Sequence, residues 1–261
     1  MLTFDQLKKY YTDSKSNPSK SILVEYLQYE ILDSIFKQKK SAQLSFIGGT
    51  AIRIAFGGNR FSEDLDFDNF GLSFDEFQEL MNEVVDDMKI KGFAMEARLI
   101  EKGAYHCYIK FPHILQEANL GSAPNEKILV RIDTVKKEKL FQPQVLTLNK
   151  FDIYRDILVN PIEVLLAQKM MAILGRKREK GRDFYDVSYL YGKTQPDFAY
   201  IEKTLNLSRA EFSEKMLARC EEFDFAFLAK DVEPFLIQVD QVSRVLGFKD
   251  FIESKLSLQK K

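Results

Sequence analysis

Asp64, Asp66 and Asp68 alternate with apolar residues in the segment 60–68 (RFSEDLDFD). A repeat of two residues is typical of a β-strand with one face in the core, so we expect the three carboxylates on its polar face. Alternate residues of a strand lie roughly 7 Å apart, and carboxylates this close disfavour each other's charge unless a cation lies between them. Because Mg²⁺ prefers carboxylate and phosphate oxygens, the segment predicts a magnesium-binding face. A charged strand face turned to solvent is the alternative.

A glycine turn precedes this strand. The apolar run 44–47 is followed by Gly48, Gly49 and Thr50, and the helical segment after them ends at Phe56. Backbone N–H groups at the start of a helix bind phosphate, and glycine lets the backbone approach a ligand closely. A pair of glycines alone is more often only a turn. Combined with the acidic strand, the turn predicts a cradle for a triphosphate beside a metal site.

A further carboxylate lies in the strand predicted at 128–135 (ILVRIDTV), where Arg131 and Asp133 share the polar face. If this strand lies beside 60–68, Asp133 completes a three-carboxylate metal site. Two Mg²⁺ ions at such a site could clamp the attacking and leaving oxygens of a phosphoryl displacement. A structural aspartate at a strand edge is the alternative.

Lys169 interrupts the apolar stripe of a helix that we expect to begin at Pro161, with Asn160 as its N-cap, and to end near Gly175. A lysine within such a stripe is costly unless it pairs or extends to solvent. Pairing with a triphosphate or with the carboxylate cluster would remove the cost.

The run 176–182 (RKREKGR) follows this helix. Its expected partner is a polyphosphate or an RNA backbone, and a solvated, flexible face is the alternative. We expect Asp183 and Asp186, which share a helix face, to orient Arg182, Lys177 or Arg178. The candidate contacts to an acceptor or its phosphates are Arg60, Lys177, Arg178, Lys180 and Arg182.

The remaining pattern predicts helices at 19–38, 73–91 and 182–191 and a hairpin from 93–101 and 104–111. After 192 the sequence is helical in pattern, so we expect an α/β half on a small mixed sheet and then a helical half. The break between them is expected near 192–197.

Composition excludes several classes of protein. The chain of 261 residues has 38 Lys+Arg and 39 Asp+Glu, a net charge of −1, so a nucleic acid must be met by a local basic patch. Cys107 and Cys220 are too few for a disulfide framework, and we interpret His106 and His113 as structural or surface residues. No apolar run spans a bilayer and no signal peptide is recognised, so we expect a soluble, cytoplasmic protein.

The segments 46–53 (FIGGTAIR) and 60–68 resemble the first motif of the AbiEii/AbiGii toxin family, nucleotidyltransferase-like toxins of type IV toxin–antitoxin and abortive infection systems. Lys169 with Ala172, and the segment 180–186, are similar to its later motifs. A further resemblance lies at 231–236 (DVEPFL). The resemblance covers roughly 44–236, most of the chain.

This resemblance implies an α+β, DNA-polymerase-β-like nucleotidyltransferase fold with a small mixed sheet, followed by a helical bundle, with expected domains 1–192 and 193–261. It implies metal ligation by Asp64 and Asp66, phosphate contact by Lys169, and an acidic role for Asp183 or Asp186. Gly48, Gly49 and Thr50 match the turn that holds the triphosphate, and Ser62 matches a position that is modifiable in some relatives. An insert containing Gly57, Gly58 and Asn59 separates the glycine turn from the first carboxylate.

The sequence therefore predicts a Mg²⁺-dependent nucleotidyltransferase that moves NMP from an NTP to an acceptor hydroxyl, such as an RNA or tRNA 3′ end, with a cognate antitoxin as a partner. Asp64, Asp66, Lys169 and Asp183 are its expected catalytic residues. Two alternatives stay open, a nucleotide-binding protein without transferase activity and a metal-dependent nuclease.

Overall fold

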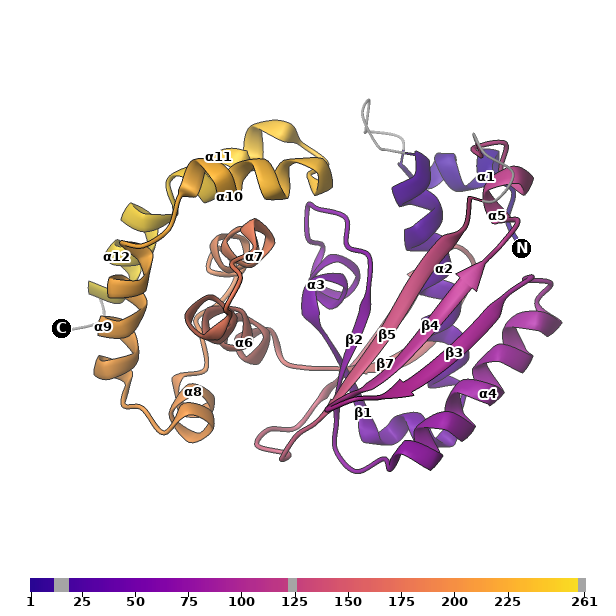
Figure 1. Cartoon of the computed structure of the whole chain (residues 1–261), viewed down its shortest axis with the longest axis horizontal. Coiled ribbons are helices and arrows are strands. Elements are labelled where there is room, and N and C mark those ends of the chain that lie inside the picture. Colours follow the sequence, from indigo (N-terminus) through magenta and orange to yellow (C-terminus); the bar gives the residue numbers. More distant parts are fainter. Residues whose placement is uncertain (12–18, 122–125, 258–261) are drawn as a thin grey trace. The chain divides into compact units, whose positions relative to one another are not determined.

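The computed structural model describes residues 1–11, 19–121 and 126–257 (Figure 1). The chain divides into two compact units. Met1–Ala55 and Phe61–Asn160 form the first, which we call the sheet unit, and Phe56–Arg60 and Pro161–Lys261 form the second, the helical unit.

The sheet unit contains, in its described residues, one seven-stranded sheet with the order β3-β4-β5-β2-β1-β7-β6. β2 pairs with β5, and β1 with β7, in parallel, whereas the other neighbours are antiparallel. This mixed sheet confirms the predicted α+β class. The strands are β1 (Leu44–Ile47), β2 (Leu65–Asn69), β3 (Glu96–Glu101), β4 (Tyr105–Phe111), β5 (Ile128–Lys136), β6 (Gln144–Lys150) and β7 (Ile153–Val159), and the helices are α1 (Phe4–Lys8), α2 (Ser19–Phe36), α3 (Gly48–Phe56), α4 (Phe74–Ile90) and α5 (Ile114–Glu117).

One face of the sheet is apolar and carries α2 and α4. Phe36 of α2 packs on Phe67 with ring centroids 6.2 Å apart, and Phe77 of α4 packs on Tyr105 at 5.7 Å. Each side chain of this size contributes about 1.5–3 kcal/mol when it is fully buried. Strand residues of the opposite parity, including Asp66 and Asp133, therefore lie on the other face, which we call the open face of the sheet.

Two local predictions differ from the structure, and one hairpin was not predicted. β2 begins only at Leu65, so the segment 61–64 is not strand. The hairpin of β6 and β7 was not predicted, because its turn residues Phe151 and Asp152 adopt φ values of 58° and 62° without a glycine to mark them. Asn160 does not cap the helix α6 (Ile162–Gly175) with its side chain, because its amide donates to the buried carboxylate of Asp68 at 2.8 Å instead.

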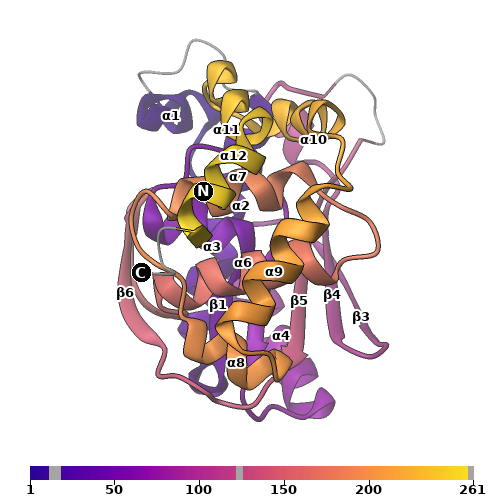
Figure 2. The same cartoon turned by 90° about the vertical axis from the view of Figure 1, so that its left-hand side faces the viewer.

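In the helical unit, α7 contacts α6, α10, α11 and α12, whereas α8 and α9 pack on α6 (Figure 2). Because α6 and α7 pack with later helices, the compact units divide at 160–161, whereas the expected domain boundary lies at 192–193. Assigning these two helices to a nucleotidyltransferase domain stays a prediction. The helices are α6 (Ile162–Gly175), α7 (Gly181–Leu190), α8 (Phe198–Leu205), α9 (Arg209–Cys220), α10 (Phe225–Val232), α11 (Ser243–Leu246) and α12 (Phe248–Ser257).

In the described part of the chain, no helix combines the length and apolar character needed to cross a bilayer. Cys107 and Cys220 are both buried and free, as expected from their number. Burial raises the pKa of the Cys107 thiol to about 12, so this group stays protonated and unreactive near neutral pH.

Candidate active site

Strand register brings the predicted carboxylates of the sheet unit together on its open face. Asp66 of β2 lies directly opposite Asp133 of the parallel strand β5, and β4 places His106 opposite Asp133 on the other side. One step along the strands, Arg131 lies opposite Tyr108. The condition that the strand at 128–135 lies beside the acidic strand is therefore met (Figure 1). We call Asp64, Asp66, His106, Arg131 and Asp133 the open-face cluster.

Arg131 links two of these carboxylates. Its Nη2 donates to Oδ2 of Asp64 at 2.8 Å, and its Nε lies 2.9 Å from Oδ2 of Asp133. The other carboxylate oxygen of Asp133, Oδ1, lies 2.7 Å from Nδ1 of His106. The Asp133 side chain is thus held between a guanidinium and an imidazole.

Burial controls the charge of Asp64. Its pKa is raised, because desolvation outweighs the favourable charge of Arg131, and the nearby carboxylates of Asp133 and Glu63 raise it further. For Arg131, burial opposes the charged form, but Asp64, Asp133 and Asp66 overcome it and raise its pKa. The open-face cluster is therefore a site of concentrated negative charge for which one arginine supplies the counter-charge.

Gly48 brings the start of α3 against Asp66. Its φ is +79°, and a Cβ built on it would lie 2.4 Å from Oδ2 of Asp66. Only glycine fits this conformation and this space, since other residues rarely adopt such a φ. The backbone of the glycine turn is therefore in contact with a carboxylate of the open-face cluster.

Thr50 fixes the same helix start to the chain before β2. Its side chain is buried, and the hydroxyl donates to the backbone carbonyl of Asp64. Thr50 thus positions Asp64, and a contact between Thr50 and a nucleotide would use its backbone N–H. The first N–H groups of a helix have no partner within the helix, which is why such a start suits an anion.

The donor chemistry of the open-face cluster fits a hard divalent cation. Asp64, Asp66 and Asp133 supply carboxylate oxygens from adjacent segments, the ligands that Mg²⁺ prefers. As these side chains stand, the described residues contain no group of three His, Cys, Asp or Glu arranged around a metal position. Arg131 contacts one oxygen of Asp64 and one of Asp133. A metal ion can be coordinated by these oxygens only if the guanidinium moves away. Asp68 is buried and held by Asn160, which separates it from the cluster.

Lys169 lies in a buried ion cluster within the helical unit. Its ammonium is 2.9 Å from Asp183 and 2.8 Å from Asp186, and the Lys169 side chain is 13% exposed. Arg60 holds both oxygens of Asp186, with Nε at 2.7 Å and Nη2 at 2.6 Å, and Arg176 lies 3.1 Å from Asp183. The lysine in the apolar stripe is therefore stabilised by carboxylates of the chain itself.

The electrostatics of this buried ion cluster follow from its pairing. Burial opposes charge on Lys169, but Asp183 and Asp186 outweigh it and raise the pKa of the ammonium. For Asp186, burial is outweighed by Arg60 and Lys169, which lower its pKa. Lys169 and Asp186 therefore stabilise each other's charged forms. The prediction that Lys169 meets a triphosphate beside Asp64 and Asp66 joins residues of two units and stays a prediction.

Residues 176–180 of the basic run form the loop between α6 and α7, and Arg182 lies in the first turn of α7. Lys177 and Arg178 are exposed, and the guanidinium of Arg182 stacks 4.3 Å from the ring centroid of Phe235. Asp186 does hold cationic side chains, but they are Arg60 and Lys169. Among the predicted acceptor contacts, Lys177 and Arg178 have the exposure such a role needs, and Lys180 is half-buried. Arg60 is 3% exposed, which does not favour it for that role.

Ser62 lies two residues before Asp64 and is half-buried. Its backbone carbonyl accepts a hydrogen bond from the Gln28 side chain at 2.9 Å, which fixes the approach to Asp64. Sequence reasoning gave no role to Arg131 and interpreted His106 as a structural or surface residue, yet both contact candidate carboxylates. Their shared strand parity with Asp133 is the signal that could have found them, once the pairing of β4 with β5 was known.

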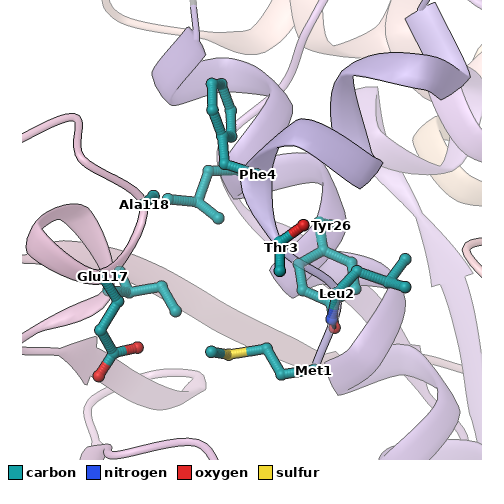
Figure 3. Close-up of a pocket in the computed structure, with 9 residues that line it drawn as sticks. Met1, Leu2, Thr3, Phe4, Tyr26, Glu117 and Ala118 are labelled. Atoms are coloured by element: carbon teal, nitrogen blue, oxygen red, sulfur yellow. Dashed lines mark hydrogen bonds between the residues drawn. The ribbon is translucent and has the colours of Figure 1, made fainter.

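A separate pocket of about 120 Å³ lies among α1, α2 and α5 (Figure 3). Met1, Leu2 and Phe4 line one side, and Glu117 and Ala118 line the other. Among the described residues that line it, none is a predicted site residue and Glu117 is the one carboxylate. The open-face cluster is therefore the better candidate for an active site.

The mixed sheet, the glycine turn and the paired carboxylates together define a nucleotidyltransferase-like protein. A family model described as "Nucleotidyl transferase AbiEii toxin, Type IV TA system" matches residues 30–247. The chain therefore belongs to the AbiEii family of nucleotidyltransferase toxins of type IV toxin–antitoxin systems. This confirms the predicted family and the enzyme class.

Solved structures support the fold. MenT4, a nucleotidyltransferase toxin from Mycobacterium tuberculosis H37Rv, is similar with a TM-score of 0.61 and 14% identity, over 97% of this chain and 90% of that one. JHP933 from Helicobacter pylori is similar with a TM-score of 0.56 and 17% identity, over 94% and 97%. A putative nucleotidyltransferase from H. pylori gives 0.58 and 17%, over 93% and 99%. No curated protein matches the chain in sequence.

Proposed function

We propose that the open-face cluster is the active site of a Mg²⁺-dependent transferase that moves NMP from an NTP to the hydroxyl of an acceptor. The observation that carries the proposal is the register of Asp66 against Asp133 on parallel strands, with the Gly48 backbone in contact with Asp66. The carboxylates lie beside the start of a helix, and such a site suits a ligand that combines a metal ion with phosphate.

In this proposal, Asp64 and Asp66 hold the metal, with Asp133 as the third carboxylate. Bound Mg²⁺, as one ion or two, would neutralise phosphate charge in the transition state and orient the reacting groups. The backbone of Gly48, Gly49 and Thr50 binds the triphosphate through its N–H groups. Catalysis then comes mainly from positioning and charge neutralisation by preorganised groups.

We propose RNA, with tRNA as the leading case, as the source of the acceptor hydroxyl. The exposed side chains of Lys177 and Arg178 support this choice, because an RNA backbone is bound through such cations. The family, described as belonging to a type IV toxin–antitoxin system, supports an antitoxin as a protein partner. We propose a role in abortive infection together with that partner. An NTP-consuming enzyme of this kind would act in the cytoplasm, where its substrates are.

The test incubates the purified chain with total RNA, Mg²⁺ and each labelled NTP, and then sequences the extended ends. We expect Asp66→Asn to lower incorporation by about 10²- to 10³-fold or more, because charge stabilisation at the reacting phosphate is lost. Asp156→Asn is the matched control. Asp156 is exposed on β7, where it accepts a hydrogen bond from Thr147, so incorporation should persist.

Other outcomes separate the alternatives. If Asp66→Asn retains wild-type incorporation, the metal site is assigned to the wrong residues. If each NTP binds but none is incorporated, the protein is a nucleotide-binding module. Shortening of the RNA in place of extension would identify a nuclease.

A further inference from the structure

Arg131 has a position that the proposed transfer does not explain. It lies on the strand that carries Asp133, two residues before it, and bridges Asp133 to Asp64 with distances of 2.9 and 2.8 Å. The side chain is 39% exposed, so it is neither locked in the core nor freely solvated. Arginine thus supplies the counter-charge to two carboxylates that are proposed to hold a metal.

A guanidinium and a divalent ion compete for the same oxygens. Each carboxylate engages Arg131 through Oδ2, and Asp133 also gives Oδ1 to His106. A metal that takes these oxygens must therefore displace the arginine or accept fewer ligands. The negative charge of Asp66 also acts on Arg131, so all three carboxylates favour its charged form.

We propose that Arg131 is an internal counter-cation that a divalent ion displaces, and that it couples metal binding to triphosphate binding. The proposal rests on the proposed function of the open-face cluster. Once a metal neutralises Asp64 and Asp133, the guanidinium loses its partners beside the glycine turn of the same unit. Its planar set of donors matches phosphate oxygens, so a triphosphate is the partner that would replace the carboxylates.

Displacement of Arg131 predicts the direction in which this residue changes the affinities for metal and for triphosphate. Arg131 stabilises the cluster without metal and therefore lowers the affinity for metal alone. It raises the affinity for a triphosphate that arrives with metal. By thermodynamic linkage, the metal and the triphosphate then raise each other's affinity by the same factor. If Arg131 only stabilised the structure, its loss would disorder the metal ligands and lower the affinity for metal.

The experiment titrates Mn²⁺ into the full chain without nucleotide, with free Mn²⁺ followed by electron paramagnetic resonance and binding heat by calorimetry. We expect Arg131→Gln to bind Mn²⁺ about tenfold more tightly than the wild type, because a competing charge within hydrogen-bond distance is removed. At saturating Mn²⁺, inorganic tripolyphosphate should bind the variant about fivefold more weakly. Arg131→Lys keeps the positive charge but not the planar set of guanidinium donors. Its Mn²⁺ affinity should therefore return toward the wild-type value.

Arg155→Gln is the matched control. Arg155 is 34% exposed and pairs with Asp33 at 2.8 Å in the same unit, but Asp33 belongs to α2, which packs on the apolar face of the sheet. Its loss should leave the Mn²⁺ affinity unchanged. Adding Asp64→Asn to Arg131→Gln should abolish the gain in affinity, which locates the ion at the cluster.

Unchanged or weaker Mn²⁺ binding by Arg131→Gln would overturn the proposal, and so would a gain that survives Asp64→Asn. An unchanged tripolyphosphate affinity would overturn the coupling. Neither titration requires turnover, so they can succeed where nucleotide incorporation fails. Failure of the proposed function is thus distinguishable from failure of this inference.

Discussion

Gly48 is in contact with Asp66, one of the two carboxylates that are proposed to hold the metal. Its φ of +79° and the 2.4 Å between a built Cβ and Oδ2 of Asp66 make substitution costly in two ways. We expect Gly48→Ala to destabilise the chain by about 1–2 kcal/mol through backbone strain and to shift Asp66. A displacement near 1 Å at a reacting group can cost about 10²-fold in rate, so incorporation should fall by that order.

Gly103 separates these two effects. It has a φ of +66° in the turn between β3 and β4, and a Cβ built on it meets no described atom within 4 Å. Gly103→Ala should therefore lower the melting temperature to a similar extent while incorporation stays at the wild-type level. Equal loss of activity in both variants would mean that strain, and not the contact with Asp66, explains the result.

A substitution of Lys169 tests whether this buried lysine stabilises the fold or binds a phosphate ligand. Its ammonium lies within 3 Å of both Asp183 and Asp186, and the aspartates are 3% and 1% exposed. Removing one partner of a buried ion pair leaves uncompensated charge, so Lys169→Met should cost about 3–5 kcal/mol in urea unfolding. Lys249→Met, which breaks an exposed pair with Glu221, should leave the unfolding midpoint nearly unchanged.

A phosphate-contacting Lys169 would give a different pattern. The variant would then keep its unfolding midpoint and lose affinity for tripolyphosphate. Measuring both quantities on the same preparation decides between the roles. Loss of both would mean that the buried ion cluster also supports the triphosphate site.

At the scale of elements, the contact of α7 with α10 depends on one glycine. A Cβ built on Gly181 would lie 1.9 Å from the backbone oxygen of Leu228, and backbone cannot rotate away as a flexible side chain can. Asp231 also accepts the Gly181 N–H at 2.8 Å, which fixes the start of α7. We expect Gly181→Ala to separate the helices and cost about 3 kcal/mol, measured by urea unfolding.

Gly175 provides the comparison, because it ends α6 and a Cβ built on it meets no described atom within 4 Å. Gly175→Ala should be neutral or slightly stabilising, since alanine favours helix. If both variants unfold at the same urea concentration, the close approach of α7 to α10 is not what limits stability.

The elements around the site were largely predictable from local patterns. The strand at 44–47 and the strand containing Asp133 follow from apolar runs and their parity, and the structure contains them. The residues 48–50, expected as a turn before the helix, are instead the first residues of α3. The hairpin of β6 and β7 was missed, although Val145 and Ile157 are typical strand residues. Its turn uses Phe151 and Asp152 at positive φ, and Phe151 is fixed there by its burial among Tyr10, Tyr26 and Tyr29, a tertiary effect that no local signal contains.

The partners of the charged residues were harder to predict than the elements. Asp183 and Asp186 were expected to pair with the neighbouring loop, because sequence reasoning favours near contacts. Asp183 does contact Arg176 of that loop at 3.1 Å. Asp186, however, pairs with Arg60, which lies 126 positions away. Similarly, the link from Arg131 to Asp64 spans 67 positions and depends on the register of β2 with β5. Long-range pairing of this kind follows from topology, which composition and periodicity do not specify.

At the scale of the whole molecule, the helical unit is discontinuous in sequence. Residues 56–60 belong to it, although they lie between α3 and β2. Arg60 and Leu236 form an isolated antiparallel β-bridge, and the Asn59 carbonyl accepts a hydrogen bond from the Ile237 N–H. The Tyr189 hydroxyl donates to the Gly57 carbonyl at 2.6 Å. The insert noted in the sequence is therefore a structural part of the helical unit.

Because residues 56–60 belong to the helical unit, we expect a substitution of Arg60 to destabilise helices that follow residue 160. Arg60 is 3% exposed and its guanidinium is held by the 1% exposed Asp186, so Arg60→Met should cost about 3–5 kcal/mol. Hydrogen exchange on the full chain should show faster exchange in α7 and α10, with protection of β1, β2 and β5 retained, because the lost pair lies within the helical unit. Arg219→Met, which removes a pair with the exposed Glu222, should change neither unit. Faster exchange confined to the sheet would contradict the assignment of 56–60 to the helical unit.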